Sequence, residues 1–372
     1  MKKYLLPVTL VGAVSTAVHA QTSVTLYGTV SAAINYATHA NPAGDHAFSM
    51  QPGTIGAANF WGLTGNEELG EGTSAHFKLE NNFNINNGSL PTAGFTQGLF
   101  GSEASVGLTT RYGRVDMGRL NTYGSAAEPL ALADPVHGGG ITTEDIWPVV
   151  YSGTRFDNAI RYRAVTNGIT LGAMYAFGGQ TEATLGGHTL AGTLGYETGP
   201  LALLGAYQTT KQNTGKTNDV LSVAAAYTFS KVTLSGSYMH VARDAGFTGI
   251  NNSGLIAGSP VDQKVNFFEA GVSWSVTPVL TWKNAYMQAV VTGGSVLGMP
   301  GNGKLQTAYS VLNYAVSKRT FLAGGINFNR WTGSYAGYWG SSAESGELAP
   351  GNPVANGSDT RMSITVGMTH AF

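Results

Sequence analysis

Apolar and polar residues alternate along most of the chain, in stretches of about ten residues. Between residues 24 and 35 the even positions are apolar or glycine, as at Val24 and Leu26, and most odd positions are polar, as at Thr25 and Ser31. A period of two predicts a β-strand with one apolar and one polar face. The same pattern recurs over residues 74–80, 155–163, 169–177, 221–229 and 361–369, whereas helical spacing extends over no useful length. The chain is therefore predicted to be all-β.

Charged residues in these stretches fall on the polar positions only. Over residues 155–163, for example, Arg155, Arg161 and Arg163 share one face and Phe156 belongs to the other. A charge on the lipid face of a transmembrane barrel costs about 2–4 kcal/mol at mid-bilayer, which would produce this segregation. A soluble β-sandwich also alternates, but it exposes many Lys and Glu on its polar face, and here that face is mostly small and uncharged. The pattern therefore favours a barrel in a membrane.

The connections between the expected strands alternate strictly between short and long. Short turns are expected near residues 68–72, 112–113, 167–168, 199–200, 230–231, 277–278 and 317–319, and long connections near 37–56, 86–98, 121–154, 179–188, 211–217, 243–262, 291–302 and 333–358. Transmembrane barrels have tight periplasmic turns and longer outer loops. These connections predict an antiparallel, sixteen-stranded transmembrane β-barrel with short periplasmic turns and long outer loops.

The first twenty residues have the features of an export signal. Lys2 and Lys3 precede an apolar run over residues 5–14, and Ala20 ends a stretch that suits signal peptidase. The apolar run is too short to cross a bilayer of about 30 Å. We therefore expect residues 1–20 to be a cleaved signal peptide and residues 21–372 to form a single barrel domain.

Composition excludes several classes of protein. The 372 residues include 52 Gly and no Cys, and only 11% are charged, against about 25% in soluble domains. Without Cys there is no disulfide framework, thiolate metal site or thiol catalysis. Twenty basic against 21 acidic residues leave no basic surface for nucleic acid. The eight His do not stand at ligand spacing, so neither a metal site nor a cofactor is expected.

Several motifs resemble those of one protein family and follow its order along the chain. They are SVTLYG at residues 23–28, WGLTGNEELG at 61–70, FKLEN at 77–81, GRVDMGR at 113–119, RFDNAIRY at 155–162, GAMYAFG at 172–178 and GMTHAF at 367–372. Together these motifs resemble the trimeric general porins of Gram-negative bacteria, in particular the betaproteobacterial branch. The resemblance implies a homotrimer in the outer membrane, in contact with lipid and lipopolysaccharide. It also implies passive diffusion of small hydrophilic solutes and ions, and recognition of the terminal Phe372 by the barrel-assembly machinery.

The resemblance also implies where such a pore is narrowest. In this family the third outer loop folds into the lumen, and acids on the loop face arginines on the opposite wall. The corresponding loop here is the connection over residues 121–154, and its acids are Glu128, Asp134, Glu144 and Asp145. The facing wall is expected to comprise Arg155, Arg161, Arg163, Tyr27 and Lys78. Opposed charges across a water-filled neck orient dipolar solutes and sort ions.

The chain departs from the family pattern at two basic positions. Phe60 stands where relatives usually have a basic residue, and Ser102 and Glu103 stand where they often have an Arg. A wall with fewer basic residues opposite an acidic loop suggests a preference for cations. Arg111, Arg114 and Lys318 are interpreted as solvated charges near a rim or turn.

Three alternatives to a general channel stay open at this point. A substrate-specific channel would share the same fold. An outer-membrane enzyme barrel would place a Ser and a His on the lipid-facing side near the outer rim, where His240 is the nearest candidate. A soluble extracellular β-protein such as an adhesin would carry more charge on its polar face and would fold without detergent.

Overall fold

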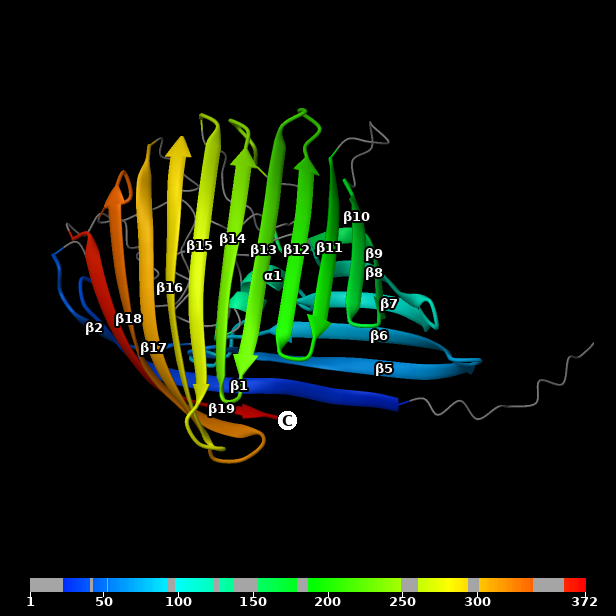
Figure 1. Ribbon diagram of the computed structural model, residues 1–372, viewed down its shortest axis with the longest axis horizontal. Coiled ribbons are helices and arrows are strands. Elements are labelled where there is room, and N and C mark those ends of the chain that lie inside the picture. Colours follow the sequence, from blue (N-terminus) through cyan, green and yellow to red (C-terminus); the bar gives the residue numbers. More distant parts are fainter. Residues whose placement is uncertain are drawn as a thin grey trace, which may run out of the picture.

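The computed structural model is a closed antiparallel β-barrel with a short helix inside it (Figure 1). The structure describes residues 23–40, 43–51, 53–91, 98–123, 127–136, 153–178, 187–248, 260–293, 301–336 and 358–372. Every strand of the wall pairs with the next along the chain, and β19 (Thr360–Ala371) pairs with β1 (Ser23–Ala37) to close the ring. Closure leaves the ring of strands without a free edge, which a lipid environment demands because backbone groups cannot be left unpaired there.

Sixteen strand positions make up the wall. One of them is shared by β2 (Ala47–Gln51) and β5 (Phe60–Gly70), which pair with different halves of β1. The other strands are β6 (Thr73–Asn82), β7 (Glu103–Thr110), β8 (Gly113–Asn121), β9 (Arg155–Thr166), β10 (Ile169–Phe177), β11 (His188–Thr198), β12 (Leu201–Lys211), β13 (Thr217–Phe229), β14 (Val232–Arg243), β15 (Gln263–Ser275), β16 (Leu280–Gly293), β17 (Gly303–Ala315) and β18 (Thr320–Gly333). β3 (Gly53–Thr54) and β4 (Ala57–Ala58) form a separate two-stranded ladder. The predicted sixteen-stranded barrel and its alternating connections are confirmed.

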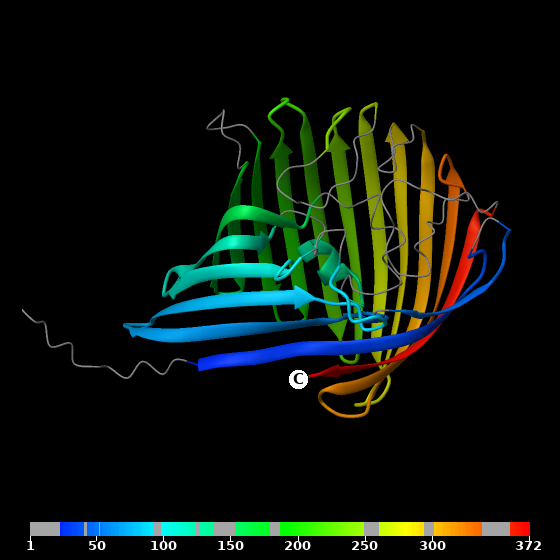
Figure 2. The ribbon, with the colours of Figure 1, turned by 180° about the vertical axis from the view of Figure 1, so that it is seen from behind.

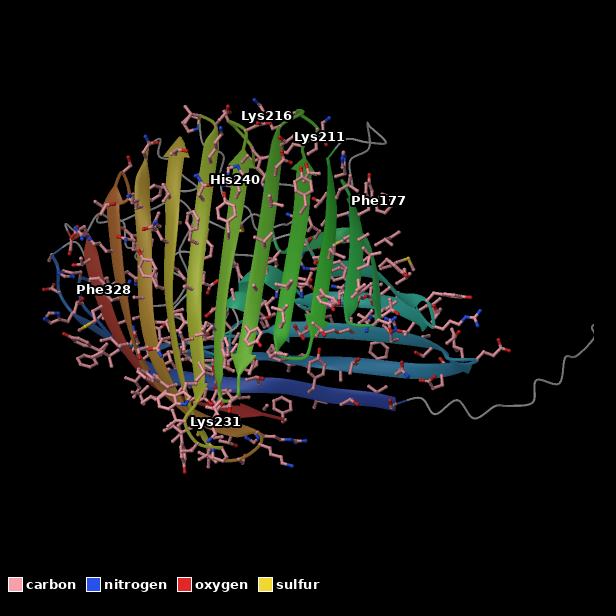
Figure 3. All side chains as sticks on the ribbon, in the orientation of Figure 1. Phe177, Lys211, Lys216, Lys231, His240 and Phe328 are labelled. Atoms are coloured by element: carbon pink, nitrogen blue, oxygen red, sulfur yellow. The ribbon has the colours of Figure 1, made fainter. Side chains whose placement is uncertain are left out.

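The outward face of the barrel is apolar, as the alternation predicts. Val24, Leu26 and Ile34 of β1 are all more than half exposed. Figure 3 shows Phe177 and Phe328 on this face, with Lys211 and Lys216 at one end of the barrel and Lys231 at the other. An apolar band between two polar ends fits the hydrocarbon layer of a bilayer. In the part of the chain that the structure describes, no helix is both long and apolar enough to cross a membrane.

A bulge in β9 reverses which face its side chains occupy. Asn158 has a φ of 54°, and β9 has one more residue than β8 between the pairs Gly118–Ala159 and Leu120–Phe156. Phe156 and Ala159 are therefore both buried in one cluster inside the barrel, although they are three residues apart. The expectation that Phe156 faces lipid is wrong, because the extra residue shifts the alternation. For the same reason Arg155 does not share a simple alternation with Arg161.

The helix α1 (Ala127–Ala133) lies inside the barrel, within the third outer connection (Figure 2). It contacts the inner faces of β12 to β15. Part of that wall is apolar on its inner side as well, through buried residues such as Val265 and Phe267. Leu130 and Val136 of the third connection and Ile55 of the first belong to the same buried cluster. The two connections thus cover a side of the inner wall, here called the loop-covered side, where apolar side chains alternate with buried polar ones such as Glu269 and Asn329. The lining expected from the sequence was polar throughout, and the apolar part of this side departs from it.

Candidate functional site

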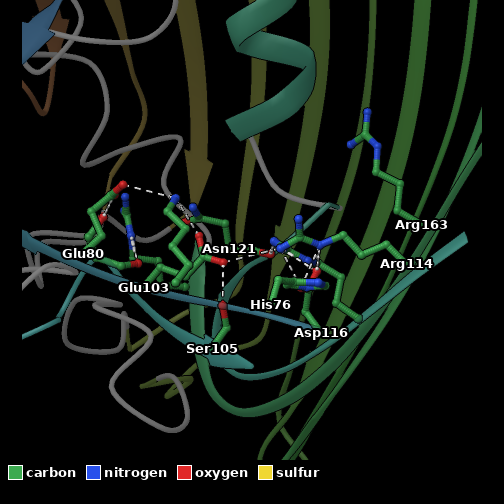
Figure 4. A network of polar contacts seen from close by, with 12 residues as sticks. His76, Glu80, Glu103, Ser105, Arg114, Asp116, Asn121 and Arg163 are labelled. Carbon is green, nitrogen blue, oxygen red and sulfur yellow. Dashed lines mark hydrogen bonds and ion pairs between the residues drawn. The ribbon is translucent and has the colours of Figure 1, made fainter. Parts of the chain in front are cut away.

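Charged side chains from four adjacent strands, β6 to β9, meet on the inner wall opposite the loop-covered side (Figure 4). We call this group the wall cluster. It comprises His76, Lys78, Glu80, Glu103, Arg114, Asp116, Arg161 and Arg163. The residues stand on alternate positions of their strands, so the pleat directs them to the same face.

Lys78 lies between two carboxylates in one half of the cluster. Its Nζ is 3.1 Å from Oε2 of Glu80 and 3.0 Å from Oε2 of Glu103. Glu80 also accepts hydrogen bonds from the hydroxyls of Tyr27, at 2.9 Å, and Ser102, at 2.5 Å. Two of the expected wall residues, Tyr27 and Lys78, are thereby joined through Glu80.

Asp116 is the centre of the other half. Its Oδ1 lies 2.8 Å from Nε2 of His76 and 2.8 Å from Nη2 of Arg114. Its Oδ2 accepts a hydrogen bond of 3.1 Å from Nη2 of Arg161. The same Arg161 nitrogen is 3.5 Å from Oε1 of Glu103, so Arg161 links the two halves.

Glycines allow these contacts to reach over an intervening strand. His76 is on β6 and Asp116 on β8, and Gly107 of β7 lies beneath their contact, where a Cβ would be 2.5 Å from Nε2 of His76. Tyr27 reaches Glu80 across β5 in the same way, and a Cβ on Gly62 would be 2.8 Å from the hydroxyl of Tyr27. Any side chain at either glycine would separate the groups that now bond.

The acids of the wall cluster are less exposed than several of its bases. The side chains of Asp116 and Glu103 are 1% and 4% exposed, whereas those of Arg114 and Arg163 are 42% and 39% exposed. Lys78 is 29% exposed. A solute beside this wall therefore meets mainly ammonium and guanidinium groups, with the carboxylates behind them.

The third connection approaches the wall cluster at its first residues. Arg163, which points away from the other labelled side chains in Figure 4, donates a hydrogen bond of 2.8 Å to Oε1 of Glu128 on α1. The guanidinium groups of Arg161 and Arg163 lie 5.2 and 5.5 Å from the ring centre of Tyr123, within cation–π range. Burial raises the pKa of Glu128, and it does so more than Arg163 lowers it. The pKa of Tyr123 is raised by burial as well.

The far end of α1 is held on the other side of the barrel. Asp134 is buried and accepts a hydrogen bond from the hydroxyl of Tyr309 on β17. The hydroxyl of Ser235 on β14 donates to the carbonyl of Ala133. The structure thus brings Glu128 to the arginine wall but places Asp134 against the opposite wall. The other two expected loop acids, Glu144 and Asp145, lie outside the described residues.

Arg155 occupies the margin of the wall cluster. Its Nε donates to the carbonyl of Ser102 at 3.0 Å, and it comes from the segment before the β9 bulge.

Sequence reasoning missed Glu103 and Asp116 as members of the wall cluster, and it assigned Arg114 to a solvated rim. The signal for Asp116 and Arg114 was present, because both stand on the face opposite the apolar Val115.

No group of three or more His, Asp or Glu that could hold a metal ion occurs among the residues that the structure describes. His240, the candidate for an enzyme barrel, has its Nδ1 2.9 Å from the amide oxygen of Asn266. That contact joins the imidazole to an amide on the neighbouring strand.

Comparison with known proteins gives consistent matches. The family model described as Gram-negative porin matches residues 8–334. An outer membrane porin protein of Bordetella pertussis is 34% identical over 192 residues, about half of each chain (48%). Outer membrane porin protein 32 of Delftia acidovorans is 31% identical over 251 residues, 63% of this chain and 68% of that one.

Solved structures share the fold over nearly the whole chain. An anion-selective porin from Comamonas acidovorans has a TM-score of 0.71 at 23% identity and covers 95% of this chain and 100% of its own. The trimer form of the OmpT outer membrane protein of Vibrio cholerae has a TM-score of 0.65 at 13% identity, with 94% and 99% coverage. At such identities the two structures support the barrel architecture alone.

Proposed function

The chain belongs to the Gram-negative porin family, and from this premise we propose that it forms an outer-membrane channel for passive diffusion of small hydrophilic solutes and ions. The observation that carries the proposal is the wall cluster, a set of charged groups on the inner face of a closed barrel, opposite a helix that bears Glu128. Exposed charges such as Arg114 belong beside water, since an unpaired charge in an apolar interior costs many kcal/mol.

The proposed path runs beside the wall of β5 to β9. The apolar cluster on the inner side of β13 to β18 is covered by Leu130, Val136 and Ile55, which leaves the wall of β6 to β9 as the side where water and solutes pass. The third connection narrows the path, and Glu128 and Arg163 mark its closest approach to the charged wall among the described residues. Fixed charges along one side of a narrow passage orient dipolar solutes and sort ions.

We propose a modest preference for anions. Lys78, Arg114 and Arg163 are each more exposed than the carboxylates with which they pair, which are 4% and 14% exposed beside Lys78, 1% beside Arg114 and 26% beside Arg163. The sequence favours the opposite hypothesis of a cation preference, because Phe60 and Glu103 stand where relatives usually have basic residues. The sign of the reversal potential in a salt gradient decides between the two hypotheses. At physiological salt the Debye length is about 8 Å, so either preference should weaken as salt rises.

The proposal includes a homotrimer in contact with outer-membrane lipid and lipopolysaccharide, inserted by the barrel-assembly machinery. A relative of the same fold has been solved in a trimer form, which supports the oligomer. Phe372, the proposed assembly signal, exchanges backbone hydrogen bonds with Gly28 of β1, and the residue is 40% exposed. A terminal residue in this position remains accessible to a partner at the barrel seam.

The test is a conductance measurement on the detergent-extracted protein in planar bilayers. Current should rise in steps that come in groups of three, and a heat-denatured sample should give none. Addition of candidate nutrients one at a time separates a general pore from a substrate-specific one, because only the latter loses ionic current at low solute concentration. Ester hydrolysis without any current would favour the enzyme barrel, and folding without detergent would favour a soluble protein.

A further inference from the structure

Glycines on the inner face of the barrel lie directly beneath side chains of the third connection. A Cβ on Gly172 of β10 would be 2.7 Å from Cδ2 of Tyr123, and one on Gly271 of β15 would be 2.6 Å from Cδ of Pro135. Carbon atoms in van der Waals contact lie about 3.5–4.0 Å apart. Neither of these two positions could therefore carry a side chain while the connection keeps its present position.

These two positions differ from other glycines in the same barrel. For a Cβ on Gly205 of β12 or on Gly324 of β18 the nearest atom would be 3.9 Å away. Glycine is unfavourable in a strand interior because it lacks a side chain to pack and loses much entropy on folding. At Gly172 and Gly271 the close approach of the connection gives a physical reason for glycine that is absent at Gly205 and Gly324.

The two glycines lie at opposite ends of α1. Tyr123 precedes the helix and rests between β10 and the guanidinium groups of Arg161 and Arg163. Pro135 follows the helix and rests on β15, next to the hydrogen bond from Ser235 to the carbonyl of Ala133. Both ends of α1 are thus attached to the wall by a polar or cation–π contact and by a ring that fits over a glycine.

We propose that Gly172 and Gly271 are positioning residues for α1 and that they set the width of the passage between α1 and the wall cluster. This inference rests on the channel proposed above. The strands that carry both glycines are fixed by ladders on either side, Gly172 between β9 and β11 and Gly271 between β14 and β16. A methyl group at either position therefore displaces the loop residue above it, together with the neighbouring side chains of Thr193 or Ser235.

The experiment compares Gly172→Ala and Gly271→Ala with Gly205→Ala as the control, because Gly205 stands on the outward face beside Leu203 and Tyr207, where a methyl group has room. Heat-modifiable mobility establishes that each variant has folded. Single-channel conductance and the size limit for a series of neutral sugars are then measured in bilayers and liposomes. Both quantities should shift in Gly172→Ala and Gly271→Ala and remain at the wild-type values in Gly205→Ala.

Second substitutions locate the cause in the loop. Tyr123→Ala removes the ring above Gly172, and Pro135→Ala removes the ring above Gly271. The double variants Gly172→Ala/Tyr123→Ala and Gly271→Ala/Pro135→Ala should lack the strain that the methyl group introduces and should differ in conductance from the corresponding glycine variants. Where a glycine variant does not fold, Tyr123→Ala or Pro135→Ala alone should shift the conductance, because each leaves the strand unchanged.

Two outcomes would overturn the inference in distinguishable ways. Wild-type conductance and sugar limit in folded Gly172→Ala and Gly271→Ala channels, or in the Tyr123→Ala and Pro135→Ala channels, would remove these glycines as positioning residues and leave the proposed channel intact. A wild-type protein that folds and conducts no current would overturn both proposals.

Discussion

His76 on β6 and Asp116 on β8 bond to one another over the strand between them, with Nε2 and Oδ1 2.8 Å apart. Gly107 of β7 makes this possible, because a Cβ there would lie 2.5 Å from the imidazole and 2.9 Å from the carboxylate. Asp116 in turn holds Arg114 and Arg161. One glycine thus determines whether the half of the wall cluster around Asp116 can form.

Substitution of Gly107 should therefore destabilise the barrel. Gly107→Ala forces His76 and Asp116 apart and leaves a buried carboxylate with fewer partners, which costs about 1–3 kcal/mol. The measurement is urea unfolding in detergent, followed by tryptophan fluorescence. Gly205→Ala, whose methyl group has room, serves as the control. Equal stability of the two variants would contradict the role assigned to Gly107.

Removal of Lys78 should shift selectivity toward cations. Lys78→Met takes away the ammonium group that lies within 3.1 Å of both Glu80 and Glu103, so the negative charge of the wall is no longer offset there. A stability loss of about 1–3 kcal/mol should accompany the shift, since both acids lose a partner. Reversal potentials in a KCl gradient measure the change. Lys211→Met, at an exposed outer position, should leave the permeability ratio unchanged.

Acidification should act on the channel through Glu128. Because burial raises the pKa of this carboxyl, it becomes neutral at a pH above the ordinary Glu value of about 4.3. The permeability ratio should move toward anions over that range, and Glu128→Gln should lack this step while Glu197→Gln retains it. The raised pKa also fixes how this group affects the free energy of unfolding. Its stabilising contribution is fully present below the pKa that Glu128 has in the unfolded chain, and it is lost as the pH rises through the pKa in the folded protein. A pH profile identical in wild type and Glu128→Gln would exclude Glu128 as the titrating group.

Arg155→Ala should also shift selectivity toward cations, by less than Lys78→Met. Arg155 contributes a positive charge at the margin of the cluster, where its Nε donates to the carbonyl of Ser102, whereas Lys78 stands between two carboxylates within the cluster. Arg319→Ala, in the turn between β17 and β18, is the matched control. An unchanged permeability ratio in Arg155→Ala would place this residue outside the narrow part of the passage.

The sequence was sufficient for the barrel because one physical requirement repeats in every strand. Residues such as Leu26 must face lipid and their neighbours must not, so strands, turns and loops could all be predicted from a period of two. The reversal at Asn158 could not be predicted, since a bulge depends on pairing with β8 and Asn is only one of several residues that adopt a positive φ.

The candidate site was less accessible to sequence reasoning for a related reason. Position along a strand indicates which face a residue occupies, but it does not indicate which of two walls a loop residue reaches. Glu128 and Asp134 are six positions apart in one loop, yet one meets Arg163 and the other meets Tyr309 across the barrel. The apolar residues on the inner side of β15, such as Phe267, were unforeseen because their partners Leu130 and Val136 come from that same loop.

The apolar contacts between the third connection and the inner wall bear on how open the barrel is. The strand ladders close the wall without Leu130 and Val136, so a barrel with this loop in water would keep its wall and enclose a wider hole. Burial of each of these side chains is worth about 1.5–3 kcal/mol, which favours the docked loop by several kcal/mol. Apolar packing inside the barrel therefore stabilises the narrow pore over the wide one.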